Sequence, residues 1–378
     1  MTETILSNCK LILADEIVIG SLVMKGDKIA GFDHGTTRGA DDLEGDYLLP
    51  GFVELHTDHL EGHFHPRPGV AWPAVSAVIA HDAQITASGI TTVFDALRAG
   101  TFDPGDVSAK EGETLARAIT SAQDAGQLRA EHFIHIRCEM PCEDTAEAAL
   151  GIASALKPKL ISIMDHTPGA RQFTSIDQFK KYYLGKRLIS PEKIDAYIEE
   201  RLEKQNLYAA RNKLAILSLA RELGIRIASH DDATEAHVAE ALQDRVAIAE
   251  FPTTAESARA AHEAGLAVMM GAPNLVRGGS HNGNISAKDV AANGHLDILS
   301  SDYVPSSLLH AAFELPGRVP SLTLAQAIRT VTSNPAKAAG LNDRGEIAPG
   351  MRADLIQVHL SRGNPVVRRV WSRGRRVM

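Results

Sequence analysis

The pattern of hydrophobic and polar residues changes twice along the chain and divides it into three parts. Residues 1–49 contain short runs of alternating character, among them CKLILAD, EIVIGSLVM and KIAGFD, separated by glycine and aspartate turn signals. Short β-like runs bounded by such turns are typical of small antiparallel sheets. We therefore predict strands, and no helix, in residues 1–49.

Residues 50–342 show a different rhythm, in which apolar runs are followed by polar loops and helix-like segments. The eight runs are GFVELH, TTVFDAL, HFIHIRCEM, LISIMDH, RIASHDD, AIAEFPTT, AVMMGAP and LDILSSD. Strands that are apolar throughout need cover on both faces, and parallel sheets flanked by helices provide it. Eight strands separated by helices predict a TIM-like (β/α)₈ barrel.

Residues 343–378 return to β-like alternation, in GEIAPGMRADLIQVHL and PVVRRVWSRGRRVM. We infer that residues 1–49 and 343–378 form the two halves of one small β-sandwich beside the barrel. The predicted fold class is therefore α/β, with a barrel domain at residues 50–342 and a sandwich domain built from both termini.

Composition and charge exclude several classes of protein. With 378 residues, 44% hydrophobic and 23% charged, the chain can bury a large core, and disorder is not expected. Its 39 basic and 47 acidic residues give a net charge of −8, which argues against binding nucleic acid or anionic membranes. No apolar run approaches the roughly 18 residues of a membrane span.

The cysteines and the N-terminus indicate the compartment. Cys9, Cys138 and Cys142 cannot form an even set of disulfides, which favours a reducing environment. The first residues lack the basic region and apolar core of a signal peptide. We expect a cytoplasmic protein.

Polar side chains follow nearly every predicted barrel strand. The carboxyl ends of barrel strands form one face, so side chains that are distant in sequence meet there. His56 and Asp58 are two positions apart and can face the same side of a strand. The strand-end set is His56, Asp58, Asp95, Glu139, Asp165, His166, His230, Asp231, Asp232, Glu250 and Asp302.

This residue set predicts a metal centre. Imidazoles and carboxylates without a thiolate suit Zn²⁺, Mn²⁺ or Fe²⁺, and an open coordination position makes such a site catalytic. Two divalent ions can activate water and hold the substrate, which predicts a hydrolase. Each residue alone has a structural alternative, and Glu139 can equally form a loop salt bridge. The predicted ligands are His56, Asp58, Glu139, His166, His230 and Asp302.

Several sequence blocks carry a family resemblance. LPGFVELHTD, the late SSD and NPAKAAGLNDRGEIAPGMRADLIQVH resemble the amidohydrolase superfamily, whose members set a metal-dependent barrel beside a sandwich from both termini. Longer blocks, such as HTDHLEGHFHPRPGVAW, DHTPGARQF, ASHDDAT and GAPNLVRGGSHNGN, resemble its PhnM-type branch. That branch comprises the α-D-ribose 1-methylphosphonate 5-triphosphate diphosphatases of the carbon–phosphorus lyase pathway. The resemblance runs from about Leu48 to about Leu360.

The resemblance implies an activity and a role for Asp302. The expected reaction is hydrolysis of a ribose triphosphate at its phosphoanhydride, which releases diphosphate and leaves the 5-phosphate. Asp302 would orient the nucleophile and take up its proton. This chain departs from the superfamily in having Asp58 in place of the second histidine of its first-strand pair. It also has no lysine at a strand end, which makes Glu139 the best candidate for a bridging ligand.

A triphosphate also needs cations, and in an acidic chain their positions are informative. Arg67, Arg171 and Arg277 each lie in a loop after a predicted strand, beside Pro, Gly or Asn residues that permit close backbone approach. We predict that they bind the phosphates and are not solvated surface charges. Four histidines, His63, His65, His81 and His281, are weaker candidates for supporting the ligands or contacting the substrate, and a structural role is equally open for them.

Two other classes of function remain open. An amidohydrolase that cleaves a C–N bond, such as a cyclic amidase or a deacetylase, would open a ring or release acetate instead of diphosphate. A non-catalytic scaffold of a pathway complex would not need the intact set of ligands. The sequence leaves open which metal is bound, how many ions bind, which phosphorus is attacked and whether the chain forms a homodimer.

Overall fold

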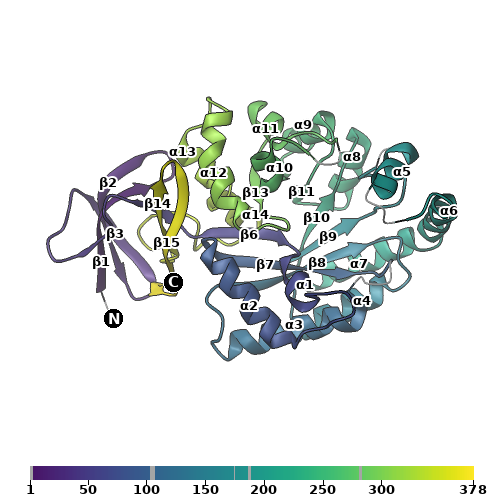
Figure 1. The fold of residues 1–378 in the computed structure, drawn as a ribbon, viewed down its shortest axis with the longest axis horizontal. Helices are drawn as coiled ribbons and strands as arrows, with labels where there is room; N and C mark the ends of the chain where they lie inside the picture. The colour runs from purple at the N-terminus through teal and green to yellow at the C-terminus, as the bar shows by residue number, and fades with distance from the viewer. Residues whose placement is uncertain (1–2, 103–106, 174, 186–188, 281–282) are drawn as a thin grey trace.

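The computed structural model describes residues 3–102, 107–173, 175–185, 189–280 and 283–378. A barrel of parallel strands surrounded by helices lies beside a separate sheet that contains both ends of the described chain (Figure 1). Among the described residues, no helix combines the length and the apolar character that crossing a membrane requires.

The predicted (β/α)₈ barrel is confirmed. Its strands pair in parallel and in chain order, and a bridge between Thr57 and Asp302 brings the last strand back to the first. Each strand overlaps one of the eight apolar runs. The strands are β6 (Phe52–Thr57), β7 (Ile90–Ala99), β8 (Glu131–Glu139), β9 (Leu160–Met164), β10 (Arg226–His230), β11 (Ile248–Glu250), β12 (Ala267–Gly271) and β13 (Ile298–Ser300).

Helices follow the strands and cover the outside of the barrel (Figure 1). They are α1 (His59–Phe64), α2 (Ala74–Ala87), α3 (Ala109–Asp124), α4 (Thr145–Ala155), α5 (Ile176–Gly185), α6 (Ile194–Lys204), η1 (Gln205–Ala209), α7 (Ala210–Leu223), α8 (Glu235–Gln243), α9 (Ala255–Glu263), α10 (Ala272–Arg277), α11 (Ala287–Ala292), α12 (Ser307–Arg318), α13 (Leu324–Arg329) and α14 (Ser333–Ala338). The helix η1 is a π-helix that continues α6 into α7.

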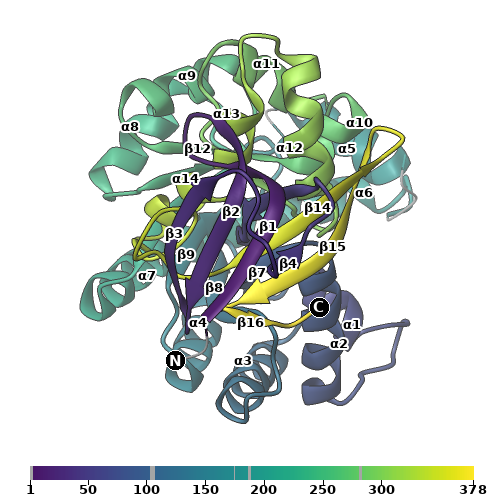
Figure 2. The ribbon, with the colours of Figure 1, turned by 90° about the vertical axis from the view of Figure 1, so that its left-hand side faces the viewer.

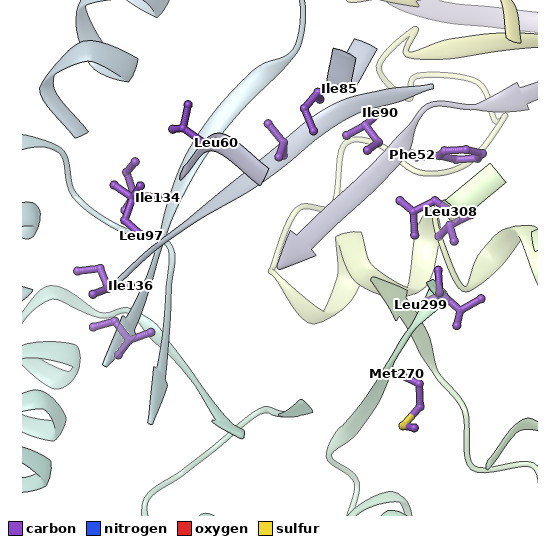
Figure 3. Close-up of a cluster of buried hydrophobic side chains, with 14 of the residues drawn as sticks. Phe52, Leu60, Ile85, Ile90, Leu97, Ile134, Ile136, Met270, Leu299 and Leu308 are labelled. Carbon is purple, nitrogen blue, oxygen red and sulfur yellow. The ribbon is translucent and has the colours of Figure 1, made fainter. Parts of the chain in front are cut away.

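Burial on both faces explains the apolar runs. In β8, Ile134 and Ile136 join the large core between the strands and the helices, part of which Figure 3 shows. Phe133, which has the opposite parity, packs in the cluster that fills the barrel, with Phe94. Because both faces need apolar side chains, this part of the strand does not alternate between apolar and polar residues. Polar residues become more frequent toward its carboxyl end, which forms the mouth of the barrel.

The two ends of the chain form one sheet, as predicted. The strands are β1 (Glu3–Ile12), β2 (Ile17–Lys25), β3 (Lys28–His34), β4 (Asp41–Asp42), β5 (Tyr47–Pro50), β14 (Leu355–Ser361), β15 (Asn364–Ser372) and β16 (Arg375–Arg376). They follow the order β16-β15-β14-β5-β1-β2-β3, with β4 on β1. Figure 2 shows N-terminal β1 and β2 side by side with C-terminal β14 and β15.

This sheet curls over its own core, which produces the sandwich. Leu6 and Leu22 of the N-terminal strands pack with Leu355 and Trp371 of the C-terminal strands in one cluster. At the rim, the Ala353 N–H, just before β14, donates to the Asp27 carbonyl, just before β3, at 2.8 Å, so the N-terminal and C-terminal segments also meet there. The burial of this shared core holds the two termini together.

An ion-pair cluster joins the sheet to the end of the barrel at which the strands begin. Glu131, the first residue of β8, accepts hydrogen bonds from Arg344, Arg352 and Arg373. Arg352 also donates to Asp354 at 2.6 Å, and both side chains are buried. Buried arginine–carboxylate pairs fix geometry because leaving one partner uncompensated is costly. The cluster therefore holds the sandwich against the end of the barrel opposite the mouth.

Candidate active site

The carboxyl ends of the barrel strands open into one cavity. It encloses about 820 Å³, counting its opening to solvent. This is the face on which barrel enzymes place their active sites. The charged and polar residues that line it include His56, Arg137, His166, His230, Asp231, Asn274, Arg277, Asp302 and Tyr303.

A first group of metal-ligand atoms comes from His166, His230 and Asp231. The Asp231 Oδ2 atom lies 3.5 Å from His166 Nε2 and 3.6 Å from His230 Nε2. This oxygen is buried and has no hydrogen-bond partner among the described residues. A buried, unpaired carboxylate oxygen that faces two imidazole nitrogens fits a divalent cation.

Glu139 lies behind this group and orients His166. Its carboxylate accepts from the His166 backbone N–H at 2.9 Å and from Nδ1 of the same ring. Nε2 is therefore left to face Asp231, as in a metal site whose histidine is held by a carboxylate. Burial lowers the pKa of His166, but Glu139 and Asp231 outweigh it and raise that pKa to about 9. The site thus attracts positive charge, and a metal ion would take the place of this proton.

A second group comes from His56, His135 and Glu250, all of them buried. The Glu250 Oε2 atom lies 3.2 Å from His56 Nδ1 and 3.1 Å from His230 Nδ1, which links the two groups. Its Oε1 atom lies 3.7 Å from His135 Nε2 and has no hydrogen-bond partner in the described part of the chain. Burial alone would raise the pKa of Glu250, but His56 and His135 hold it well below its usual value. The second group is therefore also suited to a cation.

Asp302 is the second residue after β13 and lines the same cavity as members of both groups. The Thr57 hydroxyl donates to its carbonyl at 2.7 Å and fixes its backbone. Burial first, and then the nearby Asp58 carboxylate, raise the pKa of Asp302 to about 7, although Arg137 and His230 oppose the shift. The carboxyl group can therefore exchange a proton near neutral pH, as a general base must.

Left-handed backbone conformations cluster at this mouth. Asp231, Phe251 and Asp302 have φ values of 57°, 54° and 53°. Asp231 and Phe251 directly follow barrel strands, and Asp302 is the second residue after β13. This conformation costs a residue with a β-carbon on the order of 1–3 kcal/mol. All three residues line the cavity. The free-energy cost of the left-handed backbone is therefore found at positions whose side chains must point toward one centre.

The structure brings together many, but not all, of the predicted ligands. His56, His166, His230 and Asp302 line the cavity, with Glu139 directly behind His166. Asp58 is not on the strand with His56, because β6 ends at Thr57. Its carboxylate accepts from Arg137 at 3.0 Å, and it belongs to neither donor group.

The predicted phosphate-binding residues also separate. Arg277, the last residue of α10, lines the cavity, and Arg67 is exposed in the loop after α1. Arg171 donates to Asp232 and, at 2.7 Å, to Glu240, and it is not among the described residues that line the cavity. The two histidine candidates lie elsewhere. His81 is buried on α2 and hydrogen-bonded to Asp95, while His281 lies outside the described residues.

Three donors were left out of the ligand prediction. Asp231 and Glu250 stood in the strand-end set, but nothing in the sequence singled them out from their neighbours. His135 lies inside β8 and was missed entirely. The sequence pattern that could have identified it is a run of polar residues at every second position. His135, Arg137 and Glu139 follow this pattern and share the inner face of one strand.

The fold and the donor set define the class as the metal-dependent amidohydrolases. The sequence profile of the amidohydrolase family matches residues 205–378. The structure resembles N-isopropylammelide isopropylaminohydrolase from Burkholderia multivorans ATCC 17616, with a TM-score of 0.66 over 100% of this chain and 98% of that chain. Their sequence identity is 17%, so this likeness concerns the fold.

Comparison with relatives of known name narrows the class. An adenine deaminase of Nitratidesulfovibrio vulgaris (strain DP4) is 24% identical over 99% of this chain and 57% of its own length. An α-D-ribose 1-methylphosphonate 5-triphosphate diphosphatase of Escherichia coli (strain K12) is 46% identical over 376 residues, which are 99% of this chain and 100% of that one. The chain belongs to the family of this diphosphatase, within the amidohydrolases.

Proposed function

We propose that this chain hydrolyses α-D-ribose 1-methylphosphonate 5-triphosphate to the 5-phosphate and diphosphate, a step in phosphonate degradation. Two facts support the proposal together: the full-length match to a relative of that name, and the convergence of two donor groups on one cavity. The oxygens of Asp231 and Glu250 are the observation that best supports the chemistry, because they are buried, face imidazole nitrogens and have no hydrogen-bond partner among the described residues.

The proposed cofactor is a pair of divalent ions, zinc or alternatively manganese or iron. His166, His230 and Asp231 would hold one ion, and His56, His135 and Glu250 the other. Asp302 lies beside both groups as a further ligand. Bound there, such ions supply Lewis acidity, which lowers the pKa of water and offsets charge on phosphate oxygens.

The remaining residues would bind the substrate and accept a proton from the attacking water. Asp302 would accept the proton of the attacking water, because its carboxylate lines the cavity beside the proposed ligands His56 and His230. Arg137, which is held by Asp58 at 3.0 Å, and Arg277 would neutralise charge that builds on the non-bridging phosphate oxygens. Arg67, on its exposed loop, would reach the outer phosphates. Arg171 already serves two carboxylates and is better assigned a structural role.

We also propose that the protein works in the cytoplasm and that its thiols are structural. Cys9, Cys138 and Cys142 are all unpaired and buried, which suits a reducing compartment. Burial raises the pKa of Cys138 and Cys142, so neither thiol is a ready nucleophile.

Phosphorus NMR of the purified enzyme with the ribose triphosphate tests the proposal. The expected products are diphosphate and the 5-phosphate, and dialysis against a strong chelator should abolish their formation. Adenine, with ammonia as the readout, tests C–N cleavage in parallel, and ATP tests general triphosphate hydrolysis. Ammonia release without diphosphate would favour the C–N-cleaving alternative, and diphosphate release that survives metal removal would contradict the metal-dependent mechanism.

A further inference from the structure

A second histidine group lies outside the mouth cavity, between helices α1 and α2. His59 and His63 are four residues apart on α1 and therefore share one helix face, and His81 projects from α2. One ring nitrogen from each lies within 4.8 Å of the others. None of the three is among the described residues that line the mouth cavity. The group also shares no residue with either set of donors proposed at the mouth.

The proton on His81 is placed by a buried carboxylate. His81 Nε2 donates to Asp95 Oδ1 at 2.8 Å, and both side chains are fully buried. The other oxygen of Asp95 accepts from His132 Nδ1 at 2.7 Å. With its proton on Nε2, His81 directs the lone pair of Nδ1 at His59 Nδ1, 3.2 Å away. A carboxylate that holds the far side of a histidine is the usual support of a metal-binding ring.

The other two rings complete the group. The ring centroids of His59 and His63 are 4.9 Å apart, and those of His63 and His81 are 5.9 Å apart. His59 is the middle member of the group, since its ring contacts both His63 and His81. The His63 ring also has the side chain of Gln84 as a hydrogen-bond partner, so one of its two nitrogens is left for the group. Neutral imidazoles with converging lone pairs are metal ligands.

We propose that His59, His63 and His81 bind one divalent ion of the zinc type, in addition to the ions at the mouth. Three imidazoles with a fourth position open to water suit Zn²⁺ or Co²⁺. His59 and His63 are partly exposed, which provides a path of entry. The neighbouring group of His81, Asp95 and His132 is not a second candidate, because its members already saturate one another by hydrogen bonds.

The position of this site suggests what it does. Helix α1 has six residues, too few to be stable without tertiary contacts. Asp58, which holds Arg137 at the mouth, precedes the first residue of that helix. An ion bound to His59, His63 and His81 would tie α1 to α2 and so stabilise the placement of Asp58.

Metal counting on the full-length enzyme tests the site. The protein is freed of metal with a chelator, reloaded with excess Zn²⁺ or Co²⁺ and desalted, and its ions are counted by mass spectrometry. His63→Ala should bind one ion fewer per chain than the unmodified protein. His65→Ala is the matched control, because His65 lies on the same segment but pairs with Glu111 at 3.1 Å. It should retain the full count.

Two further readouts keep the result interpretable. Added Zn²⁺ should raise the melting temperature of the unmodified protein and of His65→Ala more than that of His63→Ala. The Co²⁺ spectrum of His63→Ala should lack one component of the visible absorption. If His63→Ala does not fold, His63→Gln replaces it. Equal ion counts in the unmodified protein and the folded His63 variant would overturn the proposal, whatever the outcome of the diphosphatase assay.

Discussion

Replacing His132 with phenylalanine should destabilise the protein at neutral pH and remove a pH dependence of its stability. His132 is fully buried and donates from Nδ1 to Asp95 at 2.7 Å, with Nε2 3.3 Å from Asp82. Burial alone would lower the pKa of His132, but the two carboxylates raise it from 6.5 to about 9. At pH 7 the ring is therefore a cation between two anions, and phenylalanine would leave Asp95 with only His81, and Asp82 with only Arg129, as a side-chain partner among the described residues.

The magnitude follows from the shift. The rise in the pKa of His132 from 6.5 to about 9 corresponds to about 3 kcal/mol of folding free energy, because one pKa unit is about 1.4 kcal/mol. Removing one partner of a buried ion pair costs about 3–5 kcal/mol, which agrees. Because the folded-state pKa is the higher one, this stability is fully present below about pH 6.5 and is lost as the pH rises through about 9. The lowered pKa of Asp95 has the opposite sign and affects only acidic pH.

Urea unfolding in the presence of chelator, at pH 6 and at pH 9.5, measures the effect. The unmodified protein should lose about 3 kcal/mol between these pH values relative to His132→Phe, whose stability is lower at pH 6. His262→Gln is the control, since His262 is partly exposed and pairs with Asp297 at the barrel surface. If the unmodified protein and His132→Phe showed the same pH dependence, the charged state assigned to this network would be wrong.

The mouth supplies three further predictions. Glu139→Gln should weaken metal binding by about 10- to 100-fold, measured by competition with a chromogenic chelator, because the ring of His166 loses its support. Asp302→Asn should lower kcat by about 10²- to 10⁴-fold with a smaller change in KM, since the proton acceptor is lost. Arg277→Ala should raise KM for the triphosphate, whereas Arg171→Ala should lower the melting temperature and leave KM nearly unchanged.

Each of these predictions has an outcome that contradicts it. Unchanged chelator competition in Glu139→Gln would remove Glu139 from the metal site. An Asp302→Asn enzyme with full kcat would exclude this residue as the base, and its metal content separates loss of proton transfer from loss of an ion. A rise in KM for Arg171→Ala equal to that for Arg277→Ala would restore Arg171 as a phosphate contact.

The barrel could be predicted from the sequence because its signal is local. A strand that packs against helices outside and against the barrel core inside must be apolar at successive positions, as Ile134 and Phe133 illustrate. Such a run, followed by a polar residue, marks both a strand and the edge at which it ends. The same reasoning located His56, His166, His230 and Asp302, which do line one cavity.

The roles of the side chains could not be predicted in the same way. Asp58 was paired with His56 on the assumption that the strand continued, but β6 ends at Thr57 and Asp58 turns to Arg137. Arg171 and Arg277 both come after a barrel strand. The Arg171 guanidinium, however, is bound by two carboxylates, one just before α8 and one on α8. These outcomes depend on which element packs beside each loop, and no short-range pattern records that.

The sequence by itself determined which segments are buried strands, that both termini share a sheet, and which polar residues stand at the mouth. Tertiary structure decided which of those residues face one another. His56 and Glu250 are 194 positions apart and meet because the barrel closes, while left-handed turns at Asp231 and Asp302 aim their side chains. Hydrophobic burial acts on each segment separately and leaves a periodic trace, whereas metal-ligand geometry depends on angles and distances between segments, which only the assembled barrel specifies.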